Sequence, residues 1–293
     1  MMNEAVWQIA PPREEARALA AELKIPKEIA QILVNRKILD AETAREFFSG
    51  DLDGLHDPYL MSGMKDAVAR IQRAIEEKEK ILIFGDYDVD GILSVVMLSR
   101  AIDSLGGRAD YFIPERLTDG YGIKEHHVDI PVARGTSLVI SVDCGIKAVE
   151  FVEKARASGV DVIITDHHRP GSQLPRPVAI LNPVLEDSGY PDKSLAGVGV
   201  VFKLIQALLE KYGKASVLRH YIKLVCIGTV ADVAELKGEN RLFVRHGLKG
   251  LENVFNTGLK SLIEACGLGK RKISEGDLGF RIGPRINAAG RMG

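Results

Sequence analysis

Residues 81–91 read ILIFGDYDVDG, an apolar run that ends in three aspartates separated by single residues. Residues 81–84 are all apolar, so the strand that they predict is buried on both faces, as strands of parallel sheets are. Helical patterns over 64–78 and 91–105 flank it. The stretch therefore predicts a strand of a doubly wound α/β domain, followed directly by acidic residues.

The same alternation of strand and helix continues along the chain. Further strands are predicted at 111–113, 138–142 and 160–165, with a helix over 148–158, and each crossover is expected to be right-handed. We therefore expect an α/β fold with a doubly wound, mainly parallel sheet, a small helical N-terminal leader and a helical C-terminal extension. The expected domains are a helical segment at 1–60, the α/β domain at 61–236 and the extension at 237–293.

Composition narrows the class of protein. The 293 residues include 39 basic and 40 acidic ones, which excludes a generally cationic nucleic-acid coat protein. No apolar run approaches the roughly 20 residues that cross a bilayer, and the first residues lack the pattern of a signal peptide. The three cysteines, Cys144, Cys226 and Cys266, are far apart, so we expect neither a disulfide framework nor a zinc knuckle, and a cytoplasmic location.

Three of the predicted strands end in acidic residues, at 85–91, at Asp143 and at 166–168. Ligands of doubly wound sheets bind outside the carboxyl ends of the strands, so these three segments should meet at one edge of the sheet. We call this edge, with its acidic residues, the rim. Asp232, in an otherwise apolar helical run, is costly to bury without a cation. Because carboxylates gathered there repel one another, a pair of divalent cations is expected, and mixed carboxylate and imidazole ligands suit manganese.

Each acidic segment also has a simpler interpretation. The residues from Asp86 resemble the start of an EF-hand loop, but the twelfth position, which needs a glutamate, is Met97. An Asp-rich turn remains open there, as does a helix N-cap at Asp143. Taken by itself, the segment 166–168 could be a solvated strand end. Taken by itself, Asp232 could belong to a structural ion pair.

Together, the four segments resemble the DHH phosphoesterase superfamily, named for the Asp-His-His triplet that stands here at 166–168. The motifs follow in the family's order: an Asp-x-Asp loop, a lone strand-end aspartate, the triplet and a later helical aspartate. Within the superfamily the chain is most similar to the RecJ-like family of single-strand-specific exonucleases. That closer similarity rests on residues 85–91, 113–117 with 119–122, 229–232 and 283–291.

The resemblance implies two manganese or magnesium ions. One ion would be held by Asp90, Asp143, His167 and Asp232, and the other by Asp88 and Asp143. Several superfamily members carry a histidine four residues before the first motif aspartate, where this chain has Phe84, so Asp86 is the nearest substitute ligand. The catalytic candidates are His168, Asp166 and Asp143, and the substrate-binding candidates are Arg116, Arg285, Asn287 and Arg291.

The implied function is metal-dependent hydrolysis of single-stranded DNA from its 5′ end, by two-metal activation of water, in DNA repair and recombination. The same metals could instead serve a phosphoesterase for short oligonucleotides, cyclic dinucleotides or nucleoside bisphosphates, and some relatives are non-catalytic replication scaffolds. Single-stranded nucleic acid and a single-strand-binding protein are the expected partners, with no membrane. Members of the family continue past the motif at 283–291 into a second nucleic-acid-binding domain, so this sequence is expected to be a fragment.

Overall fold

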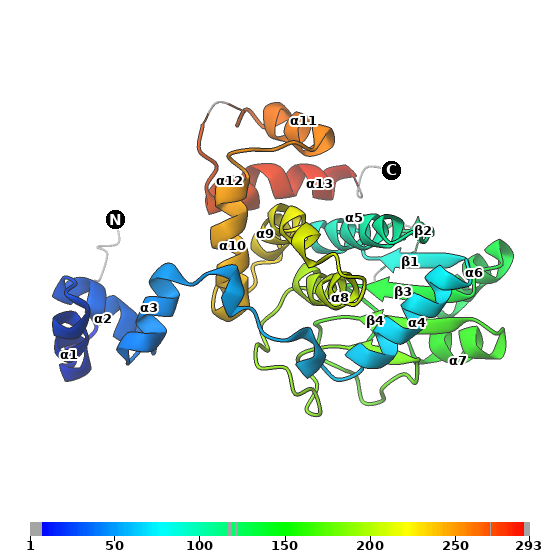
Figure 1. Cartoon of the computed structure of the whole chain (residues 1–293), viewed down its shortest axis with the longest axis horizontal. Coiled ribbons are helices and arrows are strands. Elements are labelled where there is room, and N and C mark those ends of the chain that lie inside the picture. The colour runs from blue at the N-terminus through cyan, green and yellow to red at the C-terminus, as the bar shows by residue number, and fades with distance from the viewer. Residues whose placement is uncertain (1–7, 117–118, 121, 270, 290–293) are drawn as a thin grey trace, which may run out of the picture. The chain divides into compact units, whose positions relative to one another are not determined.

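The chain divides into two compact units, Met1–Gly54 and Leu55–Gly293. The computed structural model (Figure 1) describes residues 8–116, 119–120, 122–269 and 271–289. The first unit is helical, as expected, and its helices are α1 (Glu14–Leu23), α2 (Lys27–Asn35) and α3 (Ala41–Ser49). Buried Ala and Leu side chains hold them together. The domain boundaries expected at 60 and 236 both fall inside the second unit, and they stay a prediction.

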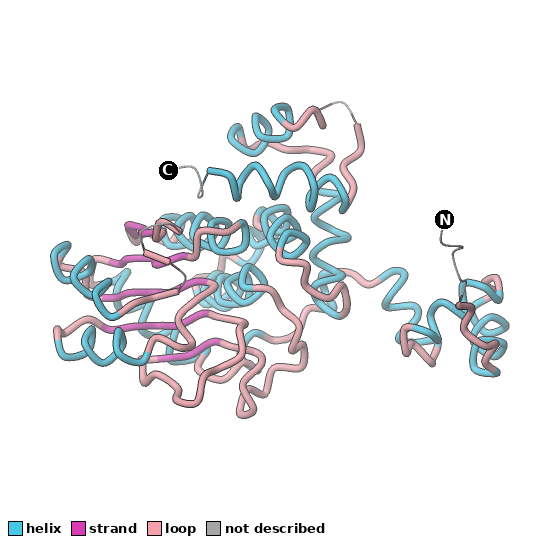
Figure 2. Tube along the Cα trace, turned by 180° about the vertical axis from the view of Figure 1, so that it is seen from behind, coloured by secondary structure: helices cyan, strands magenta, loops and turns pink. Residues whose placement is uncertain are grey.

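The second unit is built on one parallel sheet with the strand order β2-β1-β3-β4-β5 (Figure 2). The strands are β1 (Ile81–Gly85), β2 (Ala109–Phe112), β3 (Leu138–Val142), β4 (Asp161–Thr165) and β5 (Ala179–Leu181). Every residue of β1 and of β3 is buried, because helices cover both faces of the sheet. The doubly wound parallel sheet predicted from the sequence is therefore confirmed.

The strand order reverses between β1 and β3, and this reversal decides which helix covers which face. Right-handed crossovers in opposite directions place α5 (Val89–Ser104) and α7 (Val149–Ala157) on opposite faces. On one face, Phe151 of α7 packs with Leu82 and Phe84 of β1. On the other, α4 (Met64–Glu76) and α5 pack against α8 (Gly197–Lys211), of which 13 of 15 residues are buried.

The remaining helical elements precede, connect or follow the strands, and the first of them, η1, belongs to the first unit. They are η1 (Leu52–Gly54), η2 (Pro58–Leu60), η3 (Glu125–Val128), α6 (Asp129–Arg134), η4 (Ala215–His220), α9 (Ile222–Ala231), α10 (Gly238–Gly250), α11 (Thr257–Ala265), α12 (Glu275–Asp277), the π-helix η5 (Leu278–Ile282) and α13 (Gly283–Ala289). Among the described residues, no helix is long and apolar enough to cross a membrane. All three cysteines are buried and unpaired.

Two features differ from the expected elements. Strand β5 lies in the polar, Pro-rich stretch 169–192, where no strand was predicted, because three residues between prolines show no periodicity. The apolar run that carries Asp232 is helical only up to Ala231, the last residue of α9. Asp232 therefore lies at the C-cap of α9 instead of inside a helix.

A buried ion pair joins α8 to the start of α10. Lys203 Nζ lies 3.0 Å from Glu239 Oε1, and both side chains are at most 1% exposed. Lys203 also donates to the His56 carbonyl oxygen at 2.6 Å, and the Tyr190 hydroxyl donates to Glu239. Burial lowers the pKa of Lys203, and the Glu239 carboxylate opposes that shift. Each charge is therefore tolerable only while the other is present.

We expect Glu239→Ala to lower the free energy of unfolding by about 3–5 kcal/mol, because the Lys203 charge is left buried without a counter-charge. Urea denaturation followed by circular dichroism measures this change. The control is Glu235→Ala, which removes an exposed partner of Lys237 and should cost less than about 1 kcal/mol. Equal losses in the two variants would contradict the role given to the buried pair.

Candidate metal centre

The acidic segments meet where the strand order reverses. The carboxyl ends of β1 and β3 lie side by side, since Gly85 pairs with Val142. The loop after β1 carries Asp86 and Asp88, and Asp143 follows β3 directly. Such a reversal point is where ligands bind in open α/β sheets. The convergence predicted from the sequence is therefore present.

The turn after β1 is tight and leads at once into α5. Helix α5 begins at Val89, so Asp90 lies in its first turn and not in the loop that the sequence suggested. The Asp88 side chain is the N-cap and accepts the Gly91 N–H at 3.0 Å. A Cβ atom at Gly91 would lie 2.5 Å from the Asp86 carbonyl oxygen, so only glycine allows this close approach.

The N-terminus of α8 holds the Asp90 carboxylate. Its two oxygens accept the backbone N–H groups of Gly197 at 2.7 Å and Val198 at 2.6 Å. These are the first N–H groups of α8, which have no partner within the helix and favour a negative charge. Asp90 is thus oriented by a core helix more than 100 residues further along the chain.

Asp143 is held in a left-handed backbone conformation, with φ of 59°. Aspartate tolerates this region better than most residues, and such strain concentrates at functional sites. The N-cap of α7 is Ala148, so the alternative interpretation of Asp143 as that cap is wrong. Asp143 Oδ1 lies 3.1 Å from His167 Nε2, and neither buried atom has a hydrogen-bond partner within the described part of the chain.

Asp166 holds the backbone and the His168 ring of the triplet in place through hydrogen bonds. One of its oxygens accepts the Ile146 N–H at 2.9 Å, and the other accepts the backbone N–H of His168 and lies 2.7 Å from its Nδ1. Burial acts to raise the pKa of Asp166, but its bonds with His168 lower it overall. The same bond raises the pKa of His168. The pair therefore favours an ionised aspartate and a charged imidazole, whose side chain is 40% exposed.

Asp232 reaches the rim from the end of α9. Its Oδ2 lies 4.0 Å from His167 Nδ1. The next residue, Val233, has a φ of 61° and is 86% exposed. A β-branched residue in the left-handed region is strained, and here the strain ends the helix at Asp232.

Among the described residues, four sets of three side chains lie close enough to share a cation, with one ligand atom per residue within 4.8 Å of the others. Two of them are Asp90, His167 and Asp232, and Asp86, Asp88 and Asp143, and a third, Asp143, His167 and His168, shares residues with both. The fourth is Asp119, His126 and His127. Phe84 packs against Phe112 and Phe151 in the core and offers no ligand atom, whereas Asp86 is one of the three carboxylates grouped with Asp88 and Asp143. Together with the unpartnered Asp143 and His167 atoms, this donor set fits two divalent cations.

The titration behaviour of the rim also fits a cation. Burial raises the pKa of Asp90 and Asp143 well above the usual value, and it raises those of Asp86 and Asp232 to about 6. Burial lowers the pKa of His167 to about 4, which leaves this imidazole neutral, as a metal ligand must be. The carboxylates repel one another, and an added positive charge would relieve that repulsion.

The expected substrate-binding residues are only partly at the rim. The Arg116 guanidinium lies over the ring of Tyr87, 5.6 Å from its centre, and Tyr87 separates Asp86 from Asp88. Arg285 is exposed on α13 and donates to the Arg281 carbonyl oxygen at 2.8 Å. The Asn287 side-chain oxygen accepts the Val89 N–H at 3.0 Å. Arg291 lies outside the described residues.

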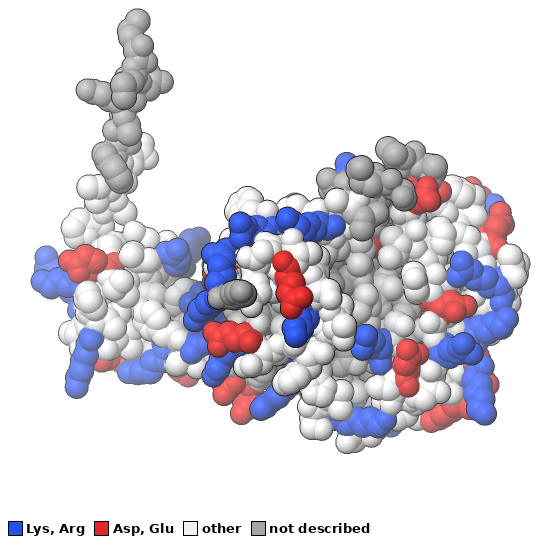
Figure 3. Space-filling model, turned by 90° about the horizontal axis from the view of Figure 1, so that it is seen from above, with Lys and Arg blue, Asp and Glu red and all other residues white. Residues whose placement is uncertain are grey.

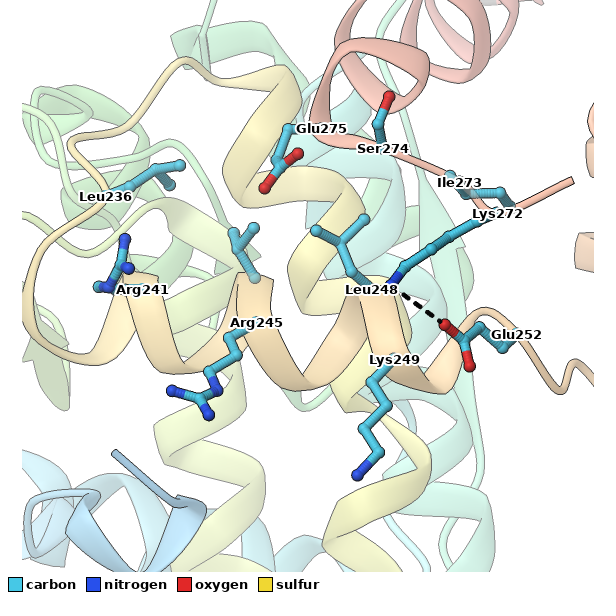
Figure 4. Close-up of a pocket in the computed structure, with 11 residues that line it drawn as sticks. Leu236, Arg241, Arg245, Leu248, Lys249, Glu252, Lys272, Ile273, Ser274 and Glu275 are labelled. Atoms are coloured by element: carbon cyan, nitrogen blue, oxygen red, sulfur yellow. Dashed lines mark ion pairs between the residues drawn. The ribbon is translucent and has the colours of Figure 1, made fainter. Parts of the chain in front are cut away.

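Several basic side chains are exposed near α11 and α13. They are Arg271, Lys272, Arg281 and Arg285, and Figure 3 shows Lys and Arg side chains on this face with Asp and Glu side chains among them. Arg271 pairs with Asp277, and Lys272 pairs with Glu252. A cavity of about 690 Å³ lies beside α10 (Figure 4). Its described lining residues are Leu236, Arg241, Val244, Arg245, Leu248, Lys249, Glu252, Lys272, Ile273, Ser274 and Glu275. None of these residues belongs to the acidic rim, so this cavity is separate from the candidate metal centre.

Sequence reasoning missed the backbone donors of the site. Gly197, Val198 and Ile146 hold Asp90 and Asp166 through N–H groups, which no side-chain motif reveals. The only signal was the glycine at 197, which must lack a Cβ atom because one would lie 2.6 Å from Asp143 Oδ1.

Comparison with known proteins identifies this arrangement. Residues 80–229 match the family model described as "DHH family, N-terminal domain". The matched range contains β1, β3, the triplet and most of α9. The chain belongs to the DHH family. The family resemblance seen in the sequence is therefore confirmed, and the DHH triplet is the Asp166–His168 segment at the rim.

Curated relatives of this DHH chain are exonucleases. It is 41% identical over 287 residues to the single-stranded-DNA-specific exonuclease RecJ of Bacillus subtilis, covering 98% of the chain and 36% of the relative. It is 38% identical to the Escherichia coli RecJ, covering 95% and 49%. The chain thus spans a third to a half of the length of these relatives.

Solved structures agree with the fold. The manganese complex of RecJ from Thermus thermophilus matches with a TM-score of 0.81 and 32% identity, over 96% of this chain and 40% of that one. A second RecJ exonuclease bound to manganese matches with a TM-score of 0.72 and 37% identity, over 80% and 58%.

Stabilisation by metal should depend on pH. The pKa values of Asp86 and Asp232 are about 6 in the folded chain against an ordinary 3.8, so the folded chain holds these two protons more tightly than the unfolded chain does. The protonated carboxyls therefore stabilise the metal-free fold below pH 4, and this stabilisation is lost as the pH rises to 6. The loss is on the order of 2–3 kcal/mol per carboxyl. Because cations bind the ionised form, the rise in melting temperature on adding Mn²⁺ should grow between pH 4 and pH 7. A rise that is the same at every pH would contradict this linkage.

Gly197→Ala should weaken Mn²⁺ binding by roughly tenfold or more, because the new methyl group would displace the Asp143 carboxylate. The matched control is Gly199→Ala in the same helix, where the nearest atom, Leu195 Cδ2, is 3.3 Å from the added Cβ. Calorimetric titration of both variants measures the difference. Equal affinities would show that the close approach does not matter.

Proposed function

We propose that this chain contains the catalytic centre of a metal-dependent exonuclease that degrades single-stranded DNA from its 5′ end. The observation that carries the proposal is the meeting of two cation-binding sets of side chains at the reversal point of the sheet. The names of the RecJ relatives, and the manganese in two of the similar structures, support the reaction and the cofactor.

The ligand sets divide between two ions. Asp90, Asp143, His167 and Asp232 would hold one Mn²⁺ or Mg²⁺ ion. The second would be held by Asp86, Asp88 and Asp143, so that Asp143 lies between the two. Two such ions supply an activated water and neutralise charge on the phosphate. The protein contributes the fixed positions: α8 orients Asp90, and the strained backbone orients Asp143.

His168 is the candidate for contact with the scissile phosphate. It is the more exposed of the two imidazoles of the triplet, and its bond to Asp166 raises its pKa, which favours the charged form. A charged imidazole can donate a hydrogen bond to a nonbridging phosphate oxygen and stabilise the charge that develops there. Asp166 acts through His168 by fixing the orientation of the ring.

Binding of the strand would use positive charge beside the rim. Arg116 and Arg285, together with Arg291, are candidates for the phosphates, since guanidinium groups form paired hydrogen bonds with them. The exposed position of Arg116 beside the Asp86–Asp88 turn supports this role. Roles in DNA repair and recombination, a single-strand-binding protein as partner, and a cytoplasmic location are proposed with the function.

The test is digestion of single strands labelled at the 5′ or 3′ end, with Mn²⁺ added. We expect mononucleotides to be released from the 5′ end, and Asp143→Ala to reduce the rate by roughly a thousandfold, because several kcal/mol of charge stabilisation are lost. Asp110→Ala, an exposed aspartate on β2, is the matched control.

Two results would contradict the proposal. If only dinucleotides or nucleoside bisphosphates were cleaved, and rates fell with strand length, the alternative phosphoesterase function would hold. If Mn²⁺ bound without hydrolysis of any nucleic acid, the non-catalytic scaffold would hold.

A further inference from the structure

Asn287 of α13 bonds to the backbone of the turn that carries the metal-site aspartates. Its Oδ1 accepts the Val89 N–H at 3.0 Å, across 198 positions of sequence. Val89 lies between Asp88 and Asp90, one from each proposed ligand set. The sequence had suggested that Asn287 binds substrate, whereas its oxygen is used inside the protein.

The bond serves a donor that has no partner within its own helix. Val89 is the first residue of α5, and the first four N–H groups of a helix lack intrahelical acceptors. The Asp88 side chain already accepts the Gly91 N–H. Without Asn287, the Val89 N–H would have to donate to water or compete with the Gly91 N–H for the Asp88 side chain. Either change would move the Asp88–Asp90 turn.

The packing of the surrounding segment keeps Asn287 in place. Helix α13 runs along α9 and α5 (Figure 1). A Cβ atom at Gly283 would lie 3.5 Å from Ala231, at the end of α9, and 3.9 Å from Val89. Leu278 and Ile282 of the preceding π-helix are fully buried. The segment therefore contacts both the element that carries Asp232 and the element that carries Asp90.

The amide is also suited to its surroundings. The carboxylates of Asp88 and Asp90 already flank Val89, so another carboxylate nearby would add to their repulsion. Asparagine offers an acceptor oxygen without a charge. Its side chain therefore fixes the turn and leaves the charge of the rim unchanged.

We propose that Asn287 is a positioning residue of the metal centre, which acts by holding the Val89 N–H and with it the Asp88–Asp90 turn. The proposal rests on the metal centre of the proposed function. It assigns the motif at 283–291 a role in preparing the metal site, in addition to any contact of its arginines with the strand.

The test compares Asn287→Leu, which removes the acceptor at similar size, with Asn287→Asp, which keeps an acceptor oxygen. The control is Ala288→Gln, at an exposed position of the same helix. We expect Asn287→Leu to weaken Mn²⁺ binding by roughly tenfold, as loss of an outer partner of a metal ligand does. In the metal-free chain, exchange of the Val89 amide hydrogen should become at least several-fold faster. Asn287→Asp should keep the slow exchange of the unmodified chain, and Ala288→Gln should change neither quantity.

Unchanged Mn²⁺ affinity and Val89 exchange in Asn287→Leu, with a raised KM for single-stranded DNA, would overturn the proposal in favour of a substrate contact. If that variant does not fold, Asn287→Ala gives the same comparison with a smaller side chain. Absence of nuclease activity in the unmodified chain would count against the proposed function alone, because Mn²⁺ affinity and amide exchange are measured without a substrate.

Discussion

Mutual repulsion between carboxylates is the constraint on which this structure depends. Six aspartates gather at one edge of the sheet, and four of them are buried: Asp86, Asp90, Asp143 and Asp166. Charge in such a place is costly unless it is paired or hydrogen-bonded. Backbone N–H groups satisfy Asp90, and His168 pairs with Asp166. The oxygen of Asp143 that faces His167 has no such partner among the described residues, and a cation would supply one.

The sequence predicts the fold and the rim because both follow from short-range patterns. Apolar runs that end in aspartate mark the strands and their carboxyl ends, and a parallel sheet brings those ends together. The order of Asp88, Asp143, the triplet and Asp232 then identifies the family. The sequence also predicts where a ligand is absent. Phe84 has an apolar side chain that cannot bind a metal, and it packs in the core.

Features that depend on tertiary contacts could not be predicted in this way. The three residues of β5 are too few to show a period, and their place in the sheet depends on pairing with β4. The contact of Asn287 with Val89 joins distant segments, and the residue type fits a substrate contact equally well. Backbone donors such as Gly197 carry no side-chain signal. The sequence therefore indicates which side chains could bind the metal, whereas the groups that orient those side chains are seen only in the folded chain.

Helix α8 has two functions at once, since it fills the interior beside the sheet and its first N–H groups hold Asp90. The rim therefore has no hinge of its own through which Asp90 could drift away while the interior stays intact. Heating should abolish the geometry of the site and the cooperative packing of the second unit in a single event. A site built in this way should keep its geometry up to the melting transition and lose it there.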